Sequence, residues 1–171
     1  MSEPEAWLRG PLAGVPPLLQ PVAHSLTQCR NEVREALRDL TPAQMGARPG
    51  GAPSVGFHAR HAIGSLDRLL TYARGEQLSA AQHEVLAREA EADVGDGAAA
   101  RLIAESDAGV GAALDQVRAT REDTLLEPRG VGRAQLPSTV IGLLVHAAEH
   151  TQRHVGQLVT TARIVRGTSV E

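Results

Sequence analysis

Residues 139–165 read TVIGLLVHAAEHTQRHVGQLVTTARIV, which is the longest amphipathic stretch of the chain. Apolar side chains recur in it at intervals of three and four residues, the spacing of one face of an α-helix. This apolar face comprises Val140, Ile141, Leu144, Ala148, Thr151, Val155, Leu158, Val159 and Ala162. A helix over the whole stretch would be about 40 Å long. The stretch therefore predicts a helix that runs the length of a small domain.

Three earlier stretches have the same helical spacing. The first covers residues 18–40, the second runs from Ser54 to about Arg74, and the third follows Asp96. Ser54 and Asp96 are residue types whose side chains cap the first turn of a helix. The chain is therefore expected to form four long helices.

Shorter elements are expected between the long helices. Thr41 and Ser79 are each followed three residues later by glutamine, the spacing of a capping box, so a short helix should begin after each. Residues 121–138 contain two prolines and two glycines and are expected to be irregular. With no convincing strand, the sequence predicts an all-α fold, a four-helix bundle with short additional helices.

The length of 171 residues suits one ordinary domain. Residues 1–17 contain four prolines and are expected to form a flexible N-terminal arm. We therefore place a single helical domain at residues 18–166, followed by a C-terminal tail at residues 167–171.

The composition excludes several classes of protein. All seventeen basic residues are arginines, which rules out Schiff-base enzymes, pyridoxal phosphate enzymes and Walker-type phosphate loops, because each needs a lysine. The single cysteine, Cys29, excludes an internal disulfide, and its place on an apolar helical face predicts a buried, unreactive thiol. A net charge of −3 and the scarcity of aromatic residues argue against nucleic-acid binding.

The chain lacks the patterns of export or membrane insertion. No apolar run approaches the roughly 20 residues that span a bilayer, and the first residues do not form a secretory signal. Together with the single cysteine, this predicts a cytoplasmic protein that binds no membrane.

The last predicted helix carries a row of histidines. His146, His150 and His154 are spaced by four residues, so they share one face, and Gln157 continues it. Histidines at this spacing lie about 6 Å apart along the helix, and their imidazoles can converge on one cation at about 2.1 Å. A third ligand must come from another segment, where His58 and His61 are both available.

Two other interpretations of this row remain open. The histidines could be partly buried side chains with ordinary hydrogen bonds. Residues 146–150 also fit the H-x-x-E-H pattern of inverted zinc peptidases, although Glu149 and Arg153 are spaced as a surface ion pair. Acidic residues of the segment 84–96 are expected to form a solvated face rather than a cation site: Glu84, Glu89, Glu91, Asp93 and Asp96.

Two blocks of the sequence resemble a known family. Residues 57–67, FHARHAIGSLD, are similar to the first histidine block of DinB/YfiT-like four-helix proteins, which include metal-dependent thiol S-transferases. Residues 150–157, HTQRHVGQ, resemble the family's last-helix block, a histidine pair followed by Gly-Gln. The resemblance covers nearly the whole chain. It implies that the metal ligands are His61, His150 and His154, with the following residues as alternative ligands or supporting contacts: His58, His146 and Gln157.

The resemblance also implies a function. A divalent ion held by three histidines keeps an open position, which is typical of catalytic rather than structural sites. Zinc or nickel is the expected ion, with iron or manganese as alternatives. The expected activity is thiol S-transfer from a small-molecule thiol to a small electrophile. The alternatives are a metal-dependent hydrolase and a non-catalytic, metal-binding or structural homodimeric helical bundle.

Two further sets of residues could contact another molecule. Arginines that could hold an anionic cosubstrate are Arg60, Arg68, Arg129 and Arg133. A homodimer is also expected, and the small residues that would permit close packing of helices in it are Gly109, Gly111, Ala112 and Ala113.

Overall fold

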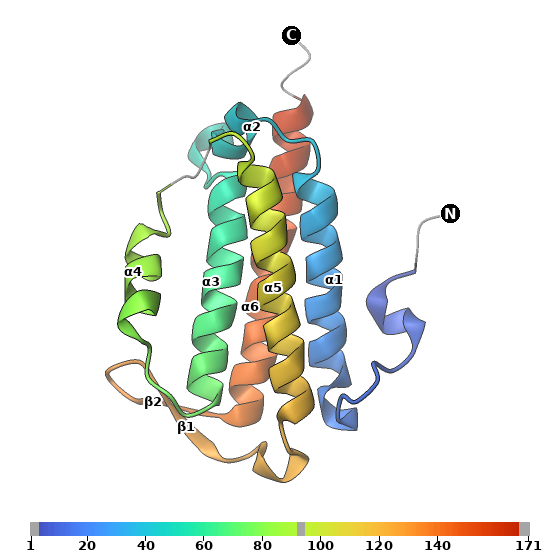
Figure 1. Ribbon diagram of the computed structural model, residues 1–171, viewed down its shortest axis with the longest axis vertical. Coiled ribbons are helices and arrows are strands. Elements are labelled where there is room, and N and C mark those ends of the chain that lie inside the picture. Colours follow the sequence, from blue (N-terminus) through green and yellow to red (C-terminus); the bar gives the residue numbers. More distant parts are fainter. Residues whose placement is uncertain (1–3, 92–94, 168–171) are drawn as a thin grey trace.

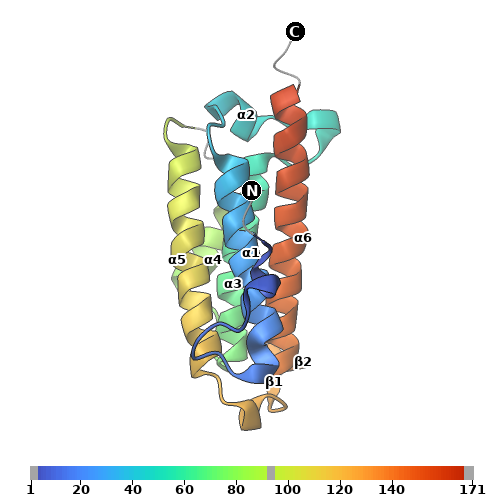
Figure 2. The same ribbon diagram turned by 90° about the vertical axis from the view of Figure 1, so that its right-hand side faces the viewer.

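The computed structural model describes residues 4–91 and 95–167. Its long helices lie side by side along one axis (Figures 1 and 2): α1 (Gln20–Leu37), α3 (Val55–Ala73), α5 (Ala98–Ala119) and α6 (Val140–Gly167). Helix α6 packs against α3 and α1, and α5 packs against the same two helices from the other side. The prediction of a mostly helical fold built on long amphipathic helices is therefore confirmed.

Short elements join the long helices. They are the 3₁₀ turns η1 (Ala6–Arg9), η2 (Pro17–Leu19), η3 (Pro49–Gly51) and η4 (Glu122–Thr124), the helices α2 (Pro42–Gly46) and α4 (Ala80–Arg88), and the strands β1 (Pro128–Val131) and β2 (Leu136–Thr139). Both short helices begin with the predicted capping boxes, since Thr41 and Ser79 accept hydrogen bonds from the backbone N–H three residues later. Helix α4 lies outside the long helices, beside α3 (Figure 1).

The core consists of two apolar clusters stacked along the axis. One joins α1, α3, α5 and the first half of α6 around Leu26, Leu66 and Leu144, and the other joins the opposite ends of these helices around Leu102 and Leu158. Cys29 belongs to the second cluster. Burial raises the pKa of its thiol to about 12, which agrees with the predicted unreactive thiol.

The prediction of no strand was wrong for one segment. Strands β1 and β2 pair antiparallel, with Pro128 opposite Thr139 and Val131 opposite Leu136. The turn between them uses Gly132 at φ +67°, a left-handed conformation that glycine adopts without strain. Four-residue strands that each contain a proline are too short and too irregular for hydrophobic alternation to reveal them.

Helix boundaries also differ from those expected. The first long helix ends at Leu37 rather than Leu40. The third long helix has Gly97 at its N-cap with φ +77°, so Asp96 does not cap it. Residues preceding α1 pack on it: Ala6 is buried, and its N–H donates to Gln28 Oε1 at 3.0 Å. The domain limits stay a prediction, and residues 168–171 of the expected tail lie outside the described residues.

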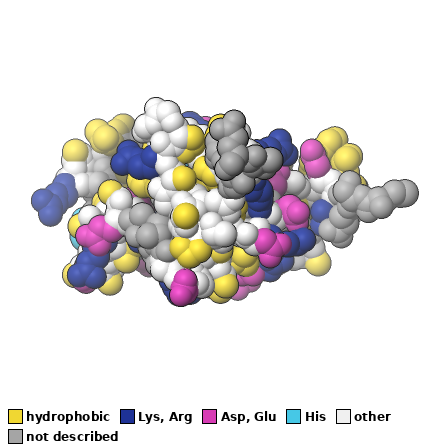
Figure 3. All heavy atoms as spheres, turned by 90° about the horizontal axis from the view of Figure 1, so that it is seen from above, with side chains coloured by type: hydrophobic (Ala, Val, Ile, Leu, Met, Phe, Trp, Pro, Cys, Tyr) yellow, Lys and Arg dark blue, Asp and Glu magenta, His cyan; other side chains and the backbone are white. Residues whose placement is uncertain are grey.

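The surface seen from above in Figure 3 carries arginines and carboxylates interspersed among apolar and neutral side chains. On this face, neither sign of charge gathers into one patch. Across residues 4–91 and 95–167, no helix combines the length and hydropathy that crossing a bilayer requires.

Candidate metal centre

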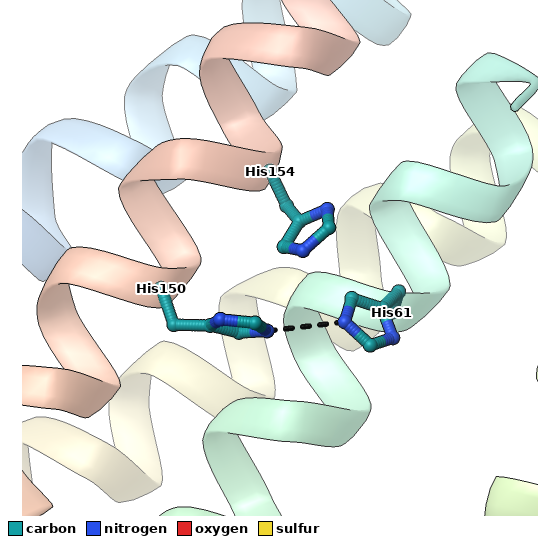
Figure 4. A group of neighbouring side chains, drawn as sticks. All are labelled: His61, His150 and His154. Atoms are coloured by element: carbon teal, nitrogen blue, oxygen red, sulfur yellow. Dashed lines mark hydrogen bonds between the residues drawn. The ribbon is translucent and has the colours of Figure 1, made fainter. Parts of the chain in front are cut away.

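Three histidines from two helices meet between α3 and α6. His61 extends from α3, and His150 and His154 extend from successive turns of α6 toward it (Figure 4). Each offers a ring nitrogen, and these nitrogens all lie within 4.8 Å of one another. The distance from His61 Nε2 to His150 Nε2 is 3.1 Å. Of the two early candidates, the structure brings His61 into this group and leaves His58 beside it.

The spacing of the nitrogens suits a metal ion. Ligands at about 2.1 Å in a tetrahedral arrangement place neighbouring nitrogens about 3.4 Å apart, close to the 3.1 Å between His61 and His150. The ring centroid of His154 lies 4.3 Å from that of His61 and 4.6 Å from that of His150. The three residues are thus positioned to hold one ion.

The protonation of these rings favours metal binding as well. Burial, followed by the charge of His61, lowers the pKa of His150 below 6.5 and that of His154 to about 4. Both imidazoles are therefore neutral near pH 7, and neutral imidazole is the form that coordinates a metal. His150 Nδ1 is buried and has no hydrogen-bond partner among the described residues.

The outer side of His61 faces a buried ion pair. His61 Nδ1 lies 2.8 Å from Glu89 Oε2, and both Arg68 Nη1 and Nη2 donate to Glu89 Oε1 at 3.1 Å. Glu89 is only 8% exposed and Arg68 only 9%. The prediction that Glu89 lies on a solvated face was therefore wrong: the end of α4 folds back onto α3, which periodicity within α4 does not reveal.

One feature of the sequence indicates this contact. His61, Gly64 and Arg68 lie three and four residues apart, on one face of α3. A Cβ atom at Gly64 would lie 2.6 Å from Glu89 Oε1, so a side chain there would displace the carboxylate. A glycine between a histidine and an arginine on one helical face indicates close approach of another segment. Asp93 of the same acidic segment lies outside the described residues.

The proposed supporting residues are distributed differently. His58 is buried, and its Nδ1 lies 3.3 Å from His154 Nδ1. Burial, with the charge of His61, lowers the pKa of His58. His146 is 52% exposed and faces Glu149. Gln157 is exposed and lines a cleft beside His154.

The glutamate of the H-x-x-E-H pattern is engaged at the surface. Glu149 forms an ion pair with Arg153, as its spacing predicts, and Arg153 lowers the pKa of Glu149. His146 and Glu149 both expose about half of their side chains and lie outside the group of three histidines. The peptidase interpretation therefore has no support in this geometry.

The four candidate arginines do not gather at the histidines. Arg68 is engaged with Glu89. Arg129, in β1, donates to the carbonyl of Ala73, at the far end of α3 and about 18 Å along the helix from His61. Arg133 lies in the connection between β1 and β2. Arg60 has two guanidinium nitrogens that are buried without a hydrogen-bond partner among the described residues.

A cleft of about 590 Å³ opens beside His154, between the start of α3, the segment before it and the C-terminal half of α6. Its apolar lining residues include Pro49, Ala52, Pro53, Phe57 and Ile164, and its polar lining residues include His58, His154, Arg153, Gln157 and Thr160. Pro49 and Pro53 of this lining belong to the segment just before α3.

Acidification is expected to destabilise the metal-free protein between about pH 6.5 and pH 4. The folded-state pKa values of His58, His150 and His154 lie below 6.5. In this window the unfolded chain binds protons that the folded chain does not. The free energy of unfolding therefore decreases as the pH decreases. Urea midpoints of chelator-treated protein at pH 7 and pH 5 measure this drop.

A matched pair of variants tests the assignment. His154→Asn should make the drop smaller, whereas His146→Asn, at an exposed position on the same helix, should leave it unchanged. An equal drop in wild type and His154→Asn would contradict the expectation.

The chain is similar to known proteins both in sequence and in fold. The sequence model of the DinB superfamily matches residues 25–158. A crystal structure described as a conserved protein from Enterococcus faecalis is 22% identical and superimposes with a TM-score of 0.66, over 88% of this chain and 98% of that one. This likeness shows the fold alone. Among curated proteins, none matches the chain.

Proposed function

Because the chain belongs to the DinB superfamily, we propose that it is a metal-dependent enzyme that transfers a small-molecule thiol to a small electrophile. In this proposal His61, His150 and His154 hold a divalent ion, and the long helices form the four-helix bundle of DinB/YfiT-like proteins. Zinc and nickel are the proposed ions, because imidazole nitrogen suits both.

The observation that carries the proposal is the meeting of three convergent imidazoles from α3 and α6, with ligand nitrogens within 4.8 Å of one another. Three protein ligands leave a divalent ion an open position for a further molecule. Such an ion lowers the pKa of a thiol or a water that binds it, because neutral imidazoles do not cancel its charge.

The cleft beside His154 supports a small organic substrate. Phe57 and Ile164 provide apolar contacts for the body of an electrophile, and Gln157 and Thr160 offer polar contacts. Because His154 belongs both to the cleft and to the group of histidines, a molecule in the cleft lies beside the position where the thiol would react.

The proposed reaction is a nucleophilic substitution. The thiol loses its proton to solvent, the sulfur uses its electron pair to form a bond with the electrophilic carbon, and the leaving group departs with the pair from the broken bond. The chain's own residues hold the reactants close together, which converts an encounter in solution into a reaction between neighbours.

Removal of the metal tests the proposal. Purified protein is expected to contain a divalent ion by elemental analysis and to accelerate the reaction of small thiols with a chlorodinitrobenzene. Chelation should lower the rate by at least about tenfold, which corresponds to about 1.4 kcal/mol of transition-state stabilisation. Adding back the ion found in the purified protein should restore the rate.

The other outcomes separate the alternatives. Metal-dependent hydrolysis of esters or amides without thiol transfer would identify a hydrolase. Bound metal without turnover of any thiol or electrophile would favour a non-catalytic metal-binding protein. Protein that holds no divalent ion after purification and binds none in titration would overturn the proposal. We propose a homodimer as well, which sedimentation of the purified chain would test.

A further inference from the structure

We propose that Glu89 is a positioning residue that orients His61 toward the metal ion, that Arg68 fixes the carboxylate, and that Gly64 provides the space for it. This inference rests on the proposed metal centre and assigns to it a carboxylate from a separate segment of the chain. Glu89 does not belong to the group of three histidines and would not touch the ion itself.

The contact between Glu89 and His61 determines which ring nitrogen carries the proton. An ionised carboxylate can only accept hydrogen bonds, so His61 Nδ1, 2.8 Å from Glu89 Oε2, must be the protonated nitrogen. The lone pair then lies on Nε2. This is the nitrogen that faces His150 Nε2 at 3.1 Å. Glu89 thus selects the tautomer of His61 that presents a ligand to the centre.

The carboxylate is itself held in place. Arg68 donates to Glu89 Oε1 through two nitrogens at 3.1 Å, and the side chains of Arg68 and Glu89 are only 11% and 8% exposed. Charge-assisted hydrogen bonds of this kind have a defined geometry. Phe57 stacks on the face of the His61 ring, with 5.5 Å between ring centroids and 7° between ring planes. His61 is therefore restrained both at Nδ1 and on its face.

Gly64 makes this arrangement possible. A Cβ atom at this position would lie 2.6 Å from Glu89 Oε1 and 2.9 Å from Arg68 Nη1. Any side chain there would displace the Glu89 carboxylate and the Arg68 guanidinium. Gly111, in the middle of α5, has no atom within 4 Å of the corresponding Cβ position. The two helical glycines thus provide a test site and a control.

The first test removes the charge of Glu89 without changing its shape. In Glu89→Gln, Arg68 can only donate, so the amide oxygen should face Arg68 and the amide NH₂ should face His61 Nδ1. This favours the opposite tautomer, with the proton on Nε2. We expect affinity for Zn²⁺, measured by competition with a chelating dye, to fall about 10- to 100-fold. Glu84→Gln, which alters an exposed ion pair on α4, should leave it unchanged.

Imidazole ¹⁵N chemical shifts report the tautomer of His61 directly. A Glu89 that served only the stability of the fold would leave this tautomer unchanged. In metal-free wild-type protein, His61 should be protonated on Nδ1, and in Glu89→Gln on Nε2. Unchanged tautomer and unchanged Zn²⁺ affinity in the variant would overturn the inference. A wild-type chain that binds no Zn²⁺ would instead overturn the proposed function, so the two failures are distinguishable.

The second test keeps the carboxylate and removes its space. Gly64→Ala, like Glu89→Gln, should lower the affinity for Zn²⁺, because the displaced carboxylate no longer reaches His61. Gly111→Ala should bind Zn²⁺ like wild type. Circular dichroism establishes that each variant is folded before titration. Equal affinity in Gly64→Ala and Gly111→Ala would contradict the role of Gly64 and of the contact that it permits.

Discussion

Replacing His150 by alanine is expected to lower the affinity for Zn²⁺ by more than about 100-fold. This loss is larger than that expected from removing a residue that only hydrogen-bonds a metal-binding histidine. The rings of His61, His150 and His154 form a triangle, with centroids 4.3 to 5.2 Å apart. Removing the ring of His150 leaves only two nitrogens to hold the ion. Isothermal titration of chelator-treated protein measures the change. His61→Ala and His154→Ala should have effects of similar size.

The control for this prediction lies one turn away on the same helix. His146 is 52% exposed and outside the group of three histidines. His146→Ala should therefore bind Zn²⁺ with wild-type affinity. A decrease in His146→Ala as large as in His150→Ala would show that the ion binds elsewhere on α6.

Stability measurements check the same assignment independently. An ion at one hundred times its dissociation constant stabilises the folded state by about 2.7 kcal/mol. Wild-type protein should gain free energy of unfolding when Zn²⁺ is added, and His150→Ala should gain none at the same concentration. The metal-free forms should differ little, because the ring of His150 is partly exposed.

The last helix shows what the sequence determines about this centre. Helical spacing alone places His146, His150 and His154 on one face, because each step of four residues turns a side chain by only about 40°. It does not distinguish which members of the row face another helix. In the structure, α3 packs along α6 so that His61 meets His150 and His154, while His146 remains at the surface. Only the resemblance to a family separated His61 from His58.

Glu89 shows what local patterns cannot determine. Its neighbours in α4 are exposed, and α4 contains no buried residue among those described. The burial of Glu89 arises from a contact with α3, more than twenty residues earlier in the chain. Hydrophobic periodicity predicts which face of a single helix or strand is buried. This contact depends instead on how a connecting segment packs against another helix. The β1–β2 hairpin was missed because its strands are too short for a period to appear.

Arg68→Ala is expected to destabilise the protein by about 3–5 kcal/mol, because it leaves the buried carboxylate of Glu89 without its arginine partner. Urea denaturation at pH 7 measures this loss. The control is Arg88→Ala, which removes an ion pair with Glu84 whose side chains are 65% and 63% exposed. Solvent screens such a pair, so its loss should cost less than about 1 kcal/mol.

A double variant separates the burial of an unpaired charge from the loss of an attraction. Replacing a buried ion pair by apolar side chains of similar size is often neutral or stabilising, since neither charge then has to leave water. Arg68→Met combined with Glu89→Met should therefore be more stable than Arg68→Ala and close to wild type. It should nevertheless bind Zn²⁺ as weakly as Glu89→Gln, because His61 has lost its acceptor. Stability and metal affinity would then vary separately, as expected if this buried pair serves the orientation of His61 rather than the stability of the fold. A double variant that is as unstable as Arg68→Ala would show that the pair is a structural requirement of the packing between α3 and α4.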